Sequence, residues 1–148
     1  EPWTDSKKRK AIRTAKFYFF DPGVTHTLAG TRTLDRNSSA YGNSFEQFIG
    51  MELRAYLSYK RVKEPLTYWR STHGYEVVYL IGTHTAIEVK ATSRVSNRDQ
   101  HGLLALSEEK AFKHMLIVSQ DKMRLKNRHI LCLHWKDFLE MPWGGKCC

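Results

Sequence analysis

The sequence predicts an α/β fold in which a central mixed sheet of four or five strands is flanked by helices. Three patterns indicate this class. Apolar residues recur at helical spacing across residues 44–57. Two β-prone stretches, 74–81 and 86–91, are joined by a short turn at 82–84, as in a hairpin. Two further apolar runs of strand length follow at 115–119 and 129–133.

The first helix should begin at Ser44, because Ser44 and Gln47 have the spacing of a capping box. Upstream of it, residues 16–20 form a short β-prone run that is closed by the turn signal Asp-Pro-Gly at 21–23. Residues 24–40 predict a short helix and a loop. The apolar stripe of the main helix consists of Phe45, Phe48, Ile49, Leu53, Tyr56 and Leu57.

The remaining elements follow in order along the chain. Residues 66–70 predict a strand with Trp69 buried and Arg70 at its edge. After the hairpin, residues 92–99 predict a polar loop, and residues 100–114 predict one helix or two short ones. A basic turn separates the last two strands. A final short helix at 135–140 should stop at Pro142 and Gly144.

The chain has 148 residues, enough for one domain, and a formal net charge of +9. Such an excess favours polyanions such as DNA or another nucleic acid, although a solvated basic surface without a dedicated partner explains it equally well. No run is long enough to span a bilayer. Three cysteines without a paired framework indicate a reducing compartment, and we expect a cytoplasmic protein.

Composition divides the chain into three parts. Residues 1–15 are polar and basic, which predicts a linker or the remnant of an upstream domain; residues 16–144 form the globular domain, and residues 145–148 a C-terminal tail. The chain begins with Glu1 rather than methionine, so we expect an excised piece of a longer protein.

Glu88 and Lys90 are the most informative pair of residues. Alternation along a strand places them on one face, about 6.6 Å apart. Burying either charge alone is costly. A carboxylate that holds a divalent cation, beside a lysine that orients a water molecule, is the chemistry that cuts phosphodiesters. The alternative is a structural ion pair within the sheet, with little net gain in stability.

The motifs together resemble one family of domains. They are Lys16-Phe-Tyr-Phe-Phe-Asp-Pro-Gly-Val24, Gly42-x-x-Phe-Glu-x-Phe48 with Glu52-Leu53, Tyr68-Trp-Arg70, Gly74-x-Glu-Val77, Ile87-Glu-Val-Lys90, Gly102-Leu-x-Ala-Leu106 and Trp135-x-x-Phe-Leu139 with Trp143. The combination is similar to the C-terminal domain of a family of prokaryotic AAA-type ATPases, a domain of unknown function with the plan of the PD-(D/E)XK nuclease-like fold. The ATPase domain that normally precedes it is absent from this chain.

The resemblance implies a restriction-endonuclease-like, three-layer core and a Mg²⁺ site. Glu88 and a helix glutamate, Glu46 with Glu52 as runner-up, would be metal ligands, and Lys90 would be catalytic. Relatives carry an aspartate, the central ligand, where this chain has Val78. Glu76 shares a face with position 78 and could replace it as a ligand, although its carboxylate would be displaced by about 6.6 Å along the strand.

Three functions therefore remain open. The first is a catalytically degenerate nuclease-like domain, without a cofactor, that binds nucleic acid or another partner. The second is an active Mg²⁺-dependent nuclease with a shifted site made of Glu46, Glu76, Glu88 and Lys90. The third is a regulatory protein-contact domain. In the first two, Arg70 and Lys90 would contact nucleic acid, with Tyr68 and Trp69 available for stacking.

Overall fold

The computed structural model describes residues 1–143. Its elements are α1 (Pro22–Leu28), α2 (Ser39–Tyr59), β1 (Leu66–Arg70), β2 (Glu76–Ile81), β3 (Thr85–Lys90), the 3-10 helix η1 (Asn97–Gln100), α3 (His101–Ser107), β4 (His114–Ser119), β5 (Leu125–Asn127), β6 (Ile130–His134) and α4 (Trp135–Trp143). The predicted α/β class is confirmed. Gly144 and the predicted tail at 145–148 lie outside the described residues.

The six strands form one mixed sheet in the order β1-β2-β3-β4-β6-β5. Strands β1, β2 and β3 form an antiparallel meander, β4 and β6 continue it in parallel with β3, and β5 closes the edge antiparallel to β6. The prediction of four or five strands is one short. The missed strand, β5, lies in the segment that was expected to be a basic turn. Its three residues are exposed and show no alternation of apolar and polar residues, so the sequence carries no signal for a strand there.

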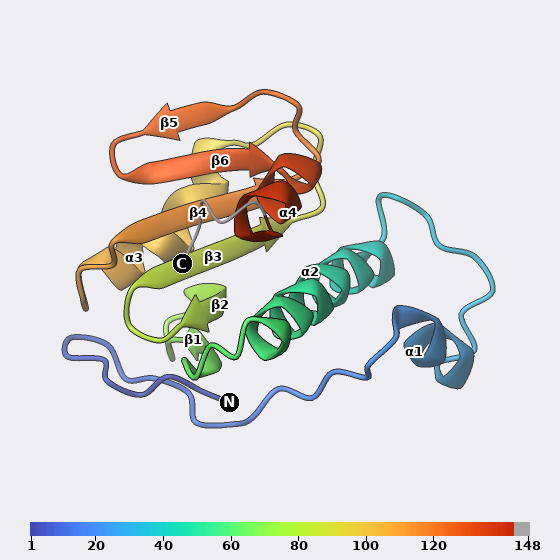
Figure 1. Ribbon diagram of the computed structural model, residues 1–148, viewed down its shortest axis with the longest axis horizontal. Helices are drawn as coiled ribbons and strands as arrows, with labels where there is room; N and C mark the ends of the chain where they lie inside the picture. Colours follow the sequence, from blue (N-terminus) through green and yellow to red (C-terminus); the bar gives the residue numbers. More distant parts are fainter. Residues whose placement is uncertain (144–148) are drawn as a thin grey trace.

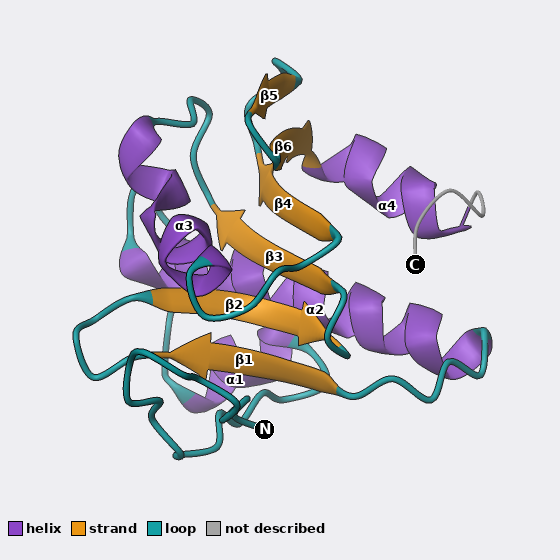
Figure 2. Ribbon diagram, turned by 90° about the vertical axis from the view of Figure 1, so that its left-hand side faces the viewer, coloured by secondary structure: helices purple, strands orange, loops and turns teal. Residues whose placement is uncertain are grey.

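Helices cover the two faces of the sheet unequally. Figure 2 shows α2 and α4 on one face and α3 on the other. The core under α2 and α4 includes Ile49, Ile87 and Phe138, and the core under α3 includes Trp69 and Leu103. Strands β3, β4 and β6 point the same way, and α2 begins beside their carboxyl ends (Figure 1).

The ends of two helices differ from the prediction. Helix α2 begins at Ser39, because the hydroxyl of Ser38 caps it by accepting from the amide of Tyr41 at 3.1 Å. Ser44 lies inside the helix, where its hydroxyl donates to the carbonyl of Ala40. Helix α4 extends to Trp143, past the predicted stop at Pro142.

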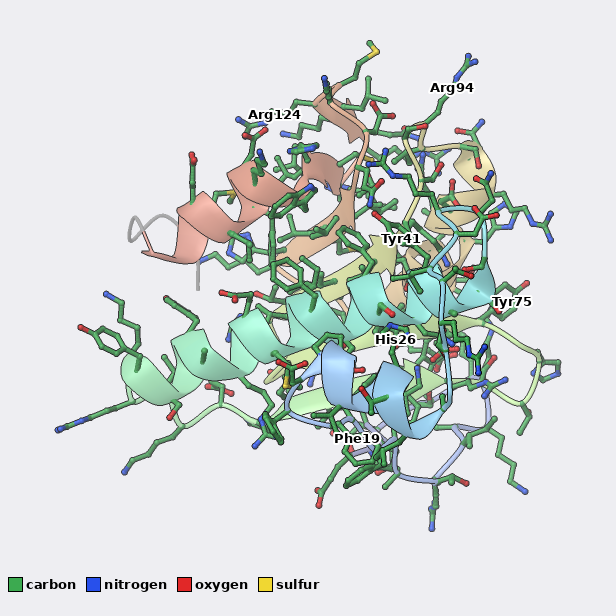
Figure 3. The ribbon with its side chains drawn as sticks, turned by 90° about the vertical axis from the view of Figure 1, so that its right-hand side faces the viewer. Phe19, His26, Tyr41, Tyr75, Arg94 and Arg124 are labelled. Carbon is green, nitrogen blue, oxygen red and sulfur yellow. The ribbon has the colours of Figure 1, made fainter. Side chains whose placement is uncertain are left out.

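The N-terminal segment packs along the domain. Trp3 is buried and meets Phe112 edge to face, with ring centroids 6.1 Å apart. The β-prone run at 16–20 is extended but pairs with no strand. It is tied to α2 instead, because the side chain of Gln47 donates to the carbonyl of Phe19 at 2.7 Å. Figure 3 shows His26 of α1 beside α2, where its Nε2 lies 2.5 Å from the hydroxyl of Ser44. Within residues 1–143, no helix combines the length and the apolar character that a membrane span requires.

Gly102 allows α3 to approach β2 closely. A Cβ at this position would lie 2.1 Å from the carbonyl oxygen of Glu76, a backbone atom that cannot move aside freely. We expect Gly102→Ala to lower the free energy of unfolding by about 1–3 kcal/mol. Gly42→Ala is the matched control, because Gly42 is also helical but has open space around it. It should be neutral or stabilising by up to about 1 kcal/mol. Equal melting temperatures for the two variants in thermal denaturation would contradict the close approach.

Candidate functional site

Strand β3 brings Glu88 and Lys90 into direct contact. Lys90 Nζ lies 2.9 Å from Glu88 Oε1, as expected for residues two apart on a strand. Only 3% of Glu88 is exposed, whereas the side chain of Lys90 is 41% exposed. The second carboxylate oxygen of Glu88, Oε2, is buried and has no hydrogen-bond partner among the described residues. Solvent therefore reaches the ammonium group of Lys90 but not the carboxylate of Glu88.

Burial is the main influence on the protonation of this pair. It raises the pKa of Glu88 to about 7, and the nearby charges of Glu46 and Glu76 add to the rise, while Lys90 opposes it. Burial also acts to lower the pKa of Lys90, but the charge of Glu88 and its hydrogen bond outweigh this effect, so the pKa of Lys90 is raised. Lys90 is consequently a cation at neutral pH, and burial makes Glu88 keep its proton to a higher pH than an exposed glutamate does.

Glu88 and Lys90 open onto a pocket of about 460 Å³ whose wall also contains Glu46, Glu76 and Val78. We call it the acidic pocket. It lies where β2 and β3 separate. The last paired residues before this point are Tyr79 of β2 and Ile87 of β3. All four residues predicted for the shifted site thus line one cavity. Glu52, the runner-up for the helix acid, does not line it.

Val78 and Glu88 face different sides of the sheet. Trp69 pairs with Val77 but Thr67 pairs with Leu80, so two residues of β2 oppose one residue of β1 in a β-bulge. The bulge turns both Val78 and Tyr79 toward the core under α2. Glu88 alternates with Val89, which belongs to that same core, and so points the other way. Position 78 borders the acidic pocket from the side of α2.

Lys16, from the extended N-terminal segment, lies between the two other carboxylates. Its ammonium group makes an ion pair with Glu76 Oε1 and lies 3.5 Å from Glu46 Oε1. Tyr18 donates to the same oxygen of Glu46 at 2.5 Å. Burial and the neighbouring Tyr79 and Glu46 raise the pKa of Tyr18, so it remains a neutral donor. Glu46 and Glu76 are thus already engaged by groups of the chain itself.

The residues present do not fit Mg²⁺. The carboxylates of Glu46, Glu76 and Glu88 are matched by cations from Lys16, Lys90 and Arg70, whose Nε lies 3.9 Å from Glu76 Oε2. Across residues 1–143, no group of three His, Cys, Asp or Glu side chains is placed to hold a metal ion. Mg²⁺ needs near-octahedral oxygen ligands, and one carboxylate oxygen of each glutamate, Oε1, already faces an ammonium group of the chain.

Sequence reasoning missed Lys16 and Tyr18. Both belong to the run that was interpreted as β-prone, and in an extended chain residues 16 and 18 share a face, which places their polar ends together. The two-residue spacing of Lys16 and Tyr18 was therefore the only sequence signal that their side chains act together. Arg70, predicted to contact nucleic acid, is exposed at the end of β1 and reaches only Glu76 among the carboxylates of the described residues.

Comparison with known proteins places the helix and sheet core in a family. The family model described as "Domain of unknown function (DUF4143)" matches residues 41–138, from α2 into α4. The chain is 34% identical over 101 residues to the uncharacterized protein Mb2031c of Mycobacterium bovis and, to the same extent, to the uncharacterized protein Rv2008c of Mycobacterium tuberculosis. The match covers 64% of this chain but 22% of each relative. No solved structure matches the chain.

Proposed function

The chain belongs to the DUF4143 family of domains of unknown function, and from this premise we propose that it is a catalytically degenerate nuclease-like domain that binds nucleic acid. The order of its elements supports a PD-(D/E)XK plan: a helix with Glu46, a meander with Glu88 and Lys90, then a helix and a strand parallel to β3. In this proposal the domain is part of a longer protein related to AAA-type ATPases.

One observation carries the degenerate assignment. Each of the three glutamates of the acidic pocket is paired with a cation of the same chain, and the fourth carboxylate of its wall, Asp99, accepts from the amide and the hydroxyl of Ser96. Lys16 lies between Glu46 and Glu76, where a bound cation would have to compete with a tethered ammonium group. Val78 contributes an isopropyl group and no oxygen donor. Glu88 and Lys90 then act as a structural ion pair.

A second candidate is an active nuclease that uses the shifted site of Glu46, Glu76, Glu88 and Lys90. Its specific support is Glu88 Oε2, which is buried without a hydrogen-bond partner and which a cation would stabilise. This candidate requires Lys16 to leave the carboxylates that it contacts. A regulatory domain that contacts only proteins is the third candidate, and the binding experiment below addresses it.

Cleavage and binding assays test the proposal together. We expect no cleavage of single- or double-stranded DNA or RNA by the unmodified chain in Mg²⁺ or Mn²⁺. We expect binding whose affinity falls with added salt, with a slope of about −0.7 per phosphate contacted on a single strand. Cleavage that Lys90→Ala abolishes would establish the active nuclease instead. The absence of any binding would favour the protein-contact domain.

A further inference from the structure

A second cavity lies, like the acidic pocket, at the carboxyl ends of the parallel strands, but its charge is different. It has a volume of about 470 Å³ and is bounded by the beginning of α2, the end of β4 and the junction of β6 with α4. Its wall includes Arg36, Tyr41, Lys122, Trp135 and Lys136, and no carboxylate. We call it the basic groove. Figure 3 looks onto this edge, with Tyr41 labelled at the beginning of α2.

Two aromatic rings are held in the basic groove. The half-buried ring of Trp135 meets Phe48 edge to face, with centroids 5.8 Å apart and an interplanar angle of 81°. The hydroxyl of Tyr41 accepts from the side chain of Gln120 at 2.6 Å. Rings fixed by packing and hydrogen bonding present their faces at a low cost in conformational entropy, and such faces stack on unpaired bases of any sequence.

The cations of the groove are free to meet an anion. Arg36, Lys122 and Lys136 are exposed, and none of them makes an ion pair within the part of the chain that the structure describes. Lys136 Nζ lies 5.5 Å from the centroid of the Trp135 ring, so charge and ring are adjacent. Exposed basic residues continue beyond the groove into β5 and its loops at Arg124, Lys126 and Arg128. Figure 3 shows Arg124 projecting outward on this side.

The basic groove and the acidic pocket lie on neighbouring strands. Lys90, at the end of β3, pairs in register with Ser119 of β4, and Ser119 pairs with His134 of β6. The loops after β3 and β4 are joined by a hydrogen bond from the amide of Gln120 to the carbonyl of Thr92 at 3.0 Å. Strands in a sheet are about 4.8 Å apart, so the groove and Lys90 are separated by only two strand spacings. A nucleic-acid strand bound in the groove would therefore reach Lys90 within a few nucleotides.

We propose that the basic groove binds single-stranded nucleic acid. Trp135 and Tyr41 stack on unpaired bases, and Arg36, Lys122 and Lys136 neutralise the phosphates beside them. An unpaired strand fits better than a duplex, because the faces of paired bases are not available to aromatic rings. This inference rests on the proposed nucleic-acid-binding function and assigns it to a surface that the nuclease-like pocket does not include.

The test uses two charge-reversed variants of the full chain. One combines Lys122→Glu with Lys136→Glu. The matched control combines Lys60→Glu with Lys63→Glu, which makes the same change in charge at exposed residues beyond the other end of α2, about 30 Å away. Binding of a fluorescent oligothymidylate is measured by anisotropy over a range of salt concentrations. We expect at least about a tenfold loss of affinity and a salt slope smaller by about 1.4 for the groove variant. The control should change affinity by less than about twofold.

A third variant, Trp135→Phe, tests stacking separately from charge. It keeps an aromatic ring against Phe48, and it should lose the quenching of tryptophan fluorescence that oligothymidylate causes in the unmodified chain. If the groove variant and the control variant lose the same affinity for oligothymidylate, nucleic acid binds to the chain but not in the basic groove. Equal affinity for a duplex, or for heparin, would overturn single-strand stacking. No binding of any oligonucleotide by the unmodified chain would overturn both the groove and the proposed function.

Discussion

Replacing Val78 by aspartate and Lys16 by methionine in one chain is expected to create a divalent-cation site that neither single variant has. The β-bulge turns position 78 toward α2, on the side of Glu46 and Glu76. An aspartate introduced there alone would be paired by Lys16, whose ammonium already contacts both glutamates. Removing Lys16 leaves three carboxylates without that cation. Oxygen ligands in this number suit Mn²⁺ and Mg²⁺.

The expected size of this effect is at least a tenfold gain in Mn²⁺ affinity, or about 1.4 kcal/mol, relative to the unmodified chain. At a concentration of 100 times its dissociation constant, Mn²⁺ should then stabilise the double variant by about 2.7 kcal/mol. Thermal denaturation with and without Mn²⁺ measures this shift. The matched control replaces Val78 by asparagine with the same Lys16→Met change, and it should show no shift. An equal response in the control would show that position 78 does not border the acidic pocket.

Glu88→Gln is expected to stabilise the protein above neutral pH and to have little effect in acid. The pKa of Glu88 is raised from 4.5 to about 7 in the folded chain, chiefly by burial. Between these two values the folded state holds a proton that the unfolded state has released, so stability falls as the pH rises through this window. At pH 8 the cost is at most about 3 kcal/mol, and glutamine avoids it. We expect a gain of about 1–3 kcal/mol at pH 8 that disappears near pH 4.5.

Denaturant titrations from pH 4.5 to 8.5 measure this prediction. Glu140→Gln serves as the control, because Glu140 is exposed on α4, and its pH profile should follow that of the unmodified chain. A loss of stability for Glu88→Gln at pH 8 would mean that the ion pair with Lys90 contributes more than burial costs. That result would contradict the interpretation of Glu88 as a carboxylate held in an unfavourable environment.

The fold could largely be predicted from local patterns. Each of the main elements has its own local signal in the sequence. These signals are the apolar stripe of α2, the hairpin of β2 and β3, and the apolar runs of β4 and β6. Strand β5 does not, because an exposed strand of three residues at the edge of a sheet has no buried face. The predicted start of α2 is six residues late because Ser44 and Gln47 have the spacing of a capping box, whereas the residue that caps the helix is Ser38.

The contact between Glu88 and Lys90 was predicted because it depends on neighbours in sequence, whereas contacts that depend on distant pairing were missed. Alternation was enough to bring Glu88 and Lys90 together. The direction of Val78 depends on how β1 pairs with β2, and a bulge is not encoded by the residues of β2 alone. Lys16 precedes Glu46 and Glu76 by 30 and 60 residues, and no periodic signal spans such separations. These contacts pair Lys16 with both Glu46 and Glu76.

Titration of the unmodified chain with Mg²⁺ and Mn²⁺ by isothermal calorimetry tests the central claim most directly. The claim is that Lys16, Arg70 and Lys90 pair with the three glutamates of the acidic pocket and take the place of a metal ion. It predicts no saturable heat of binding for either ion at millimolar concentration. A saturable isotherm with a micromolar dissociation constant that is lost in Glu88→Gln would contradict it, because it would show that Glu88 binds a divalent cation in the unmodified chain.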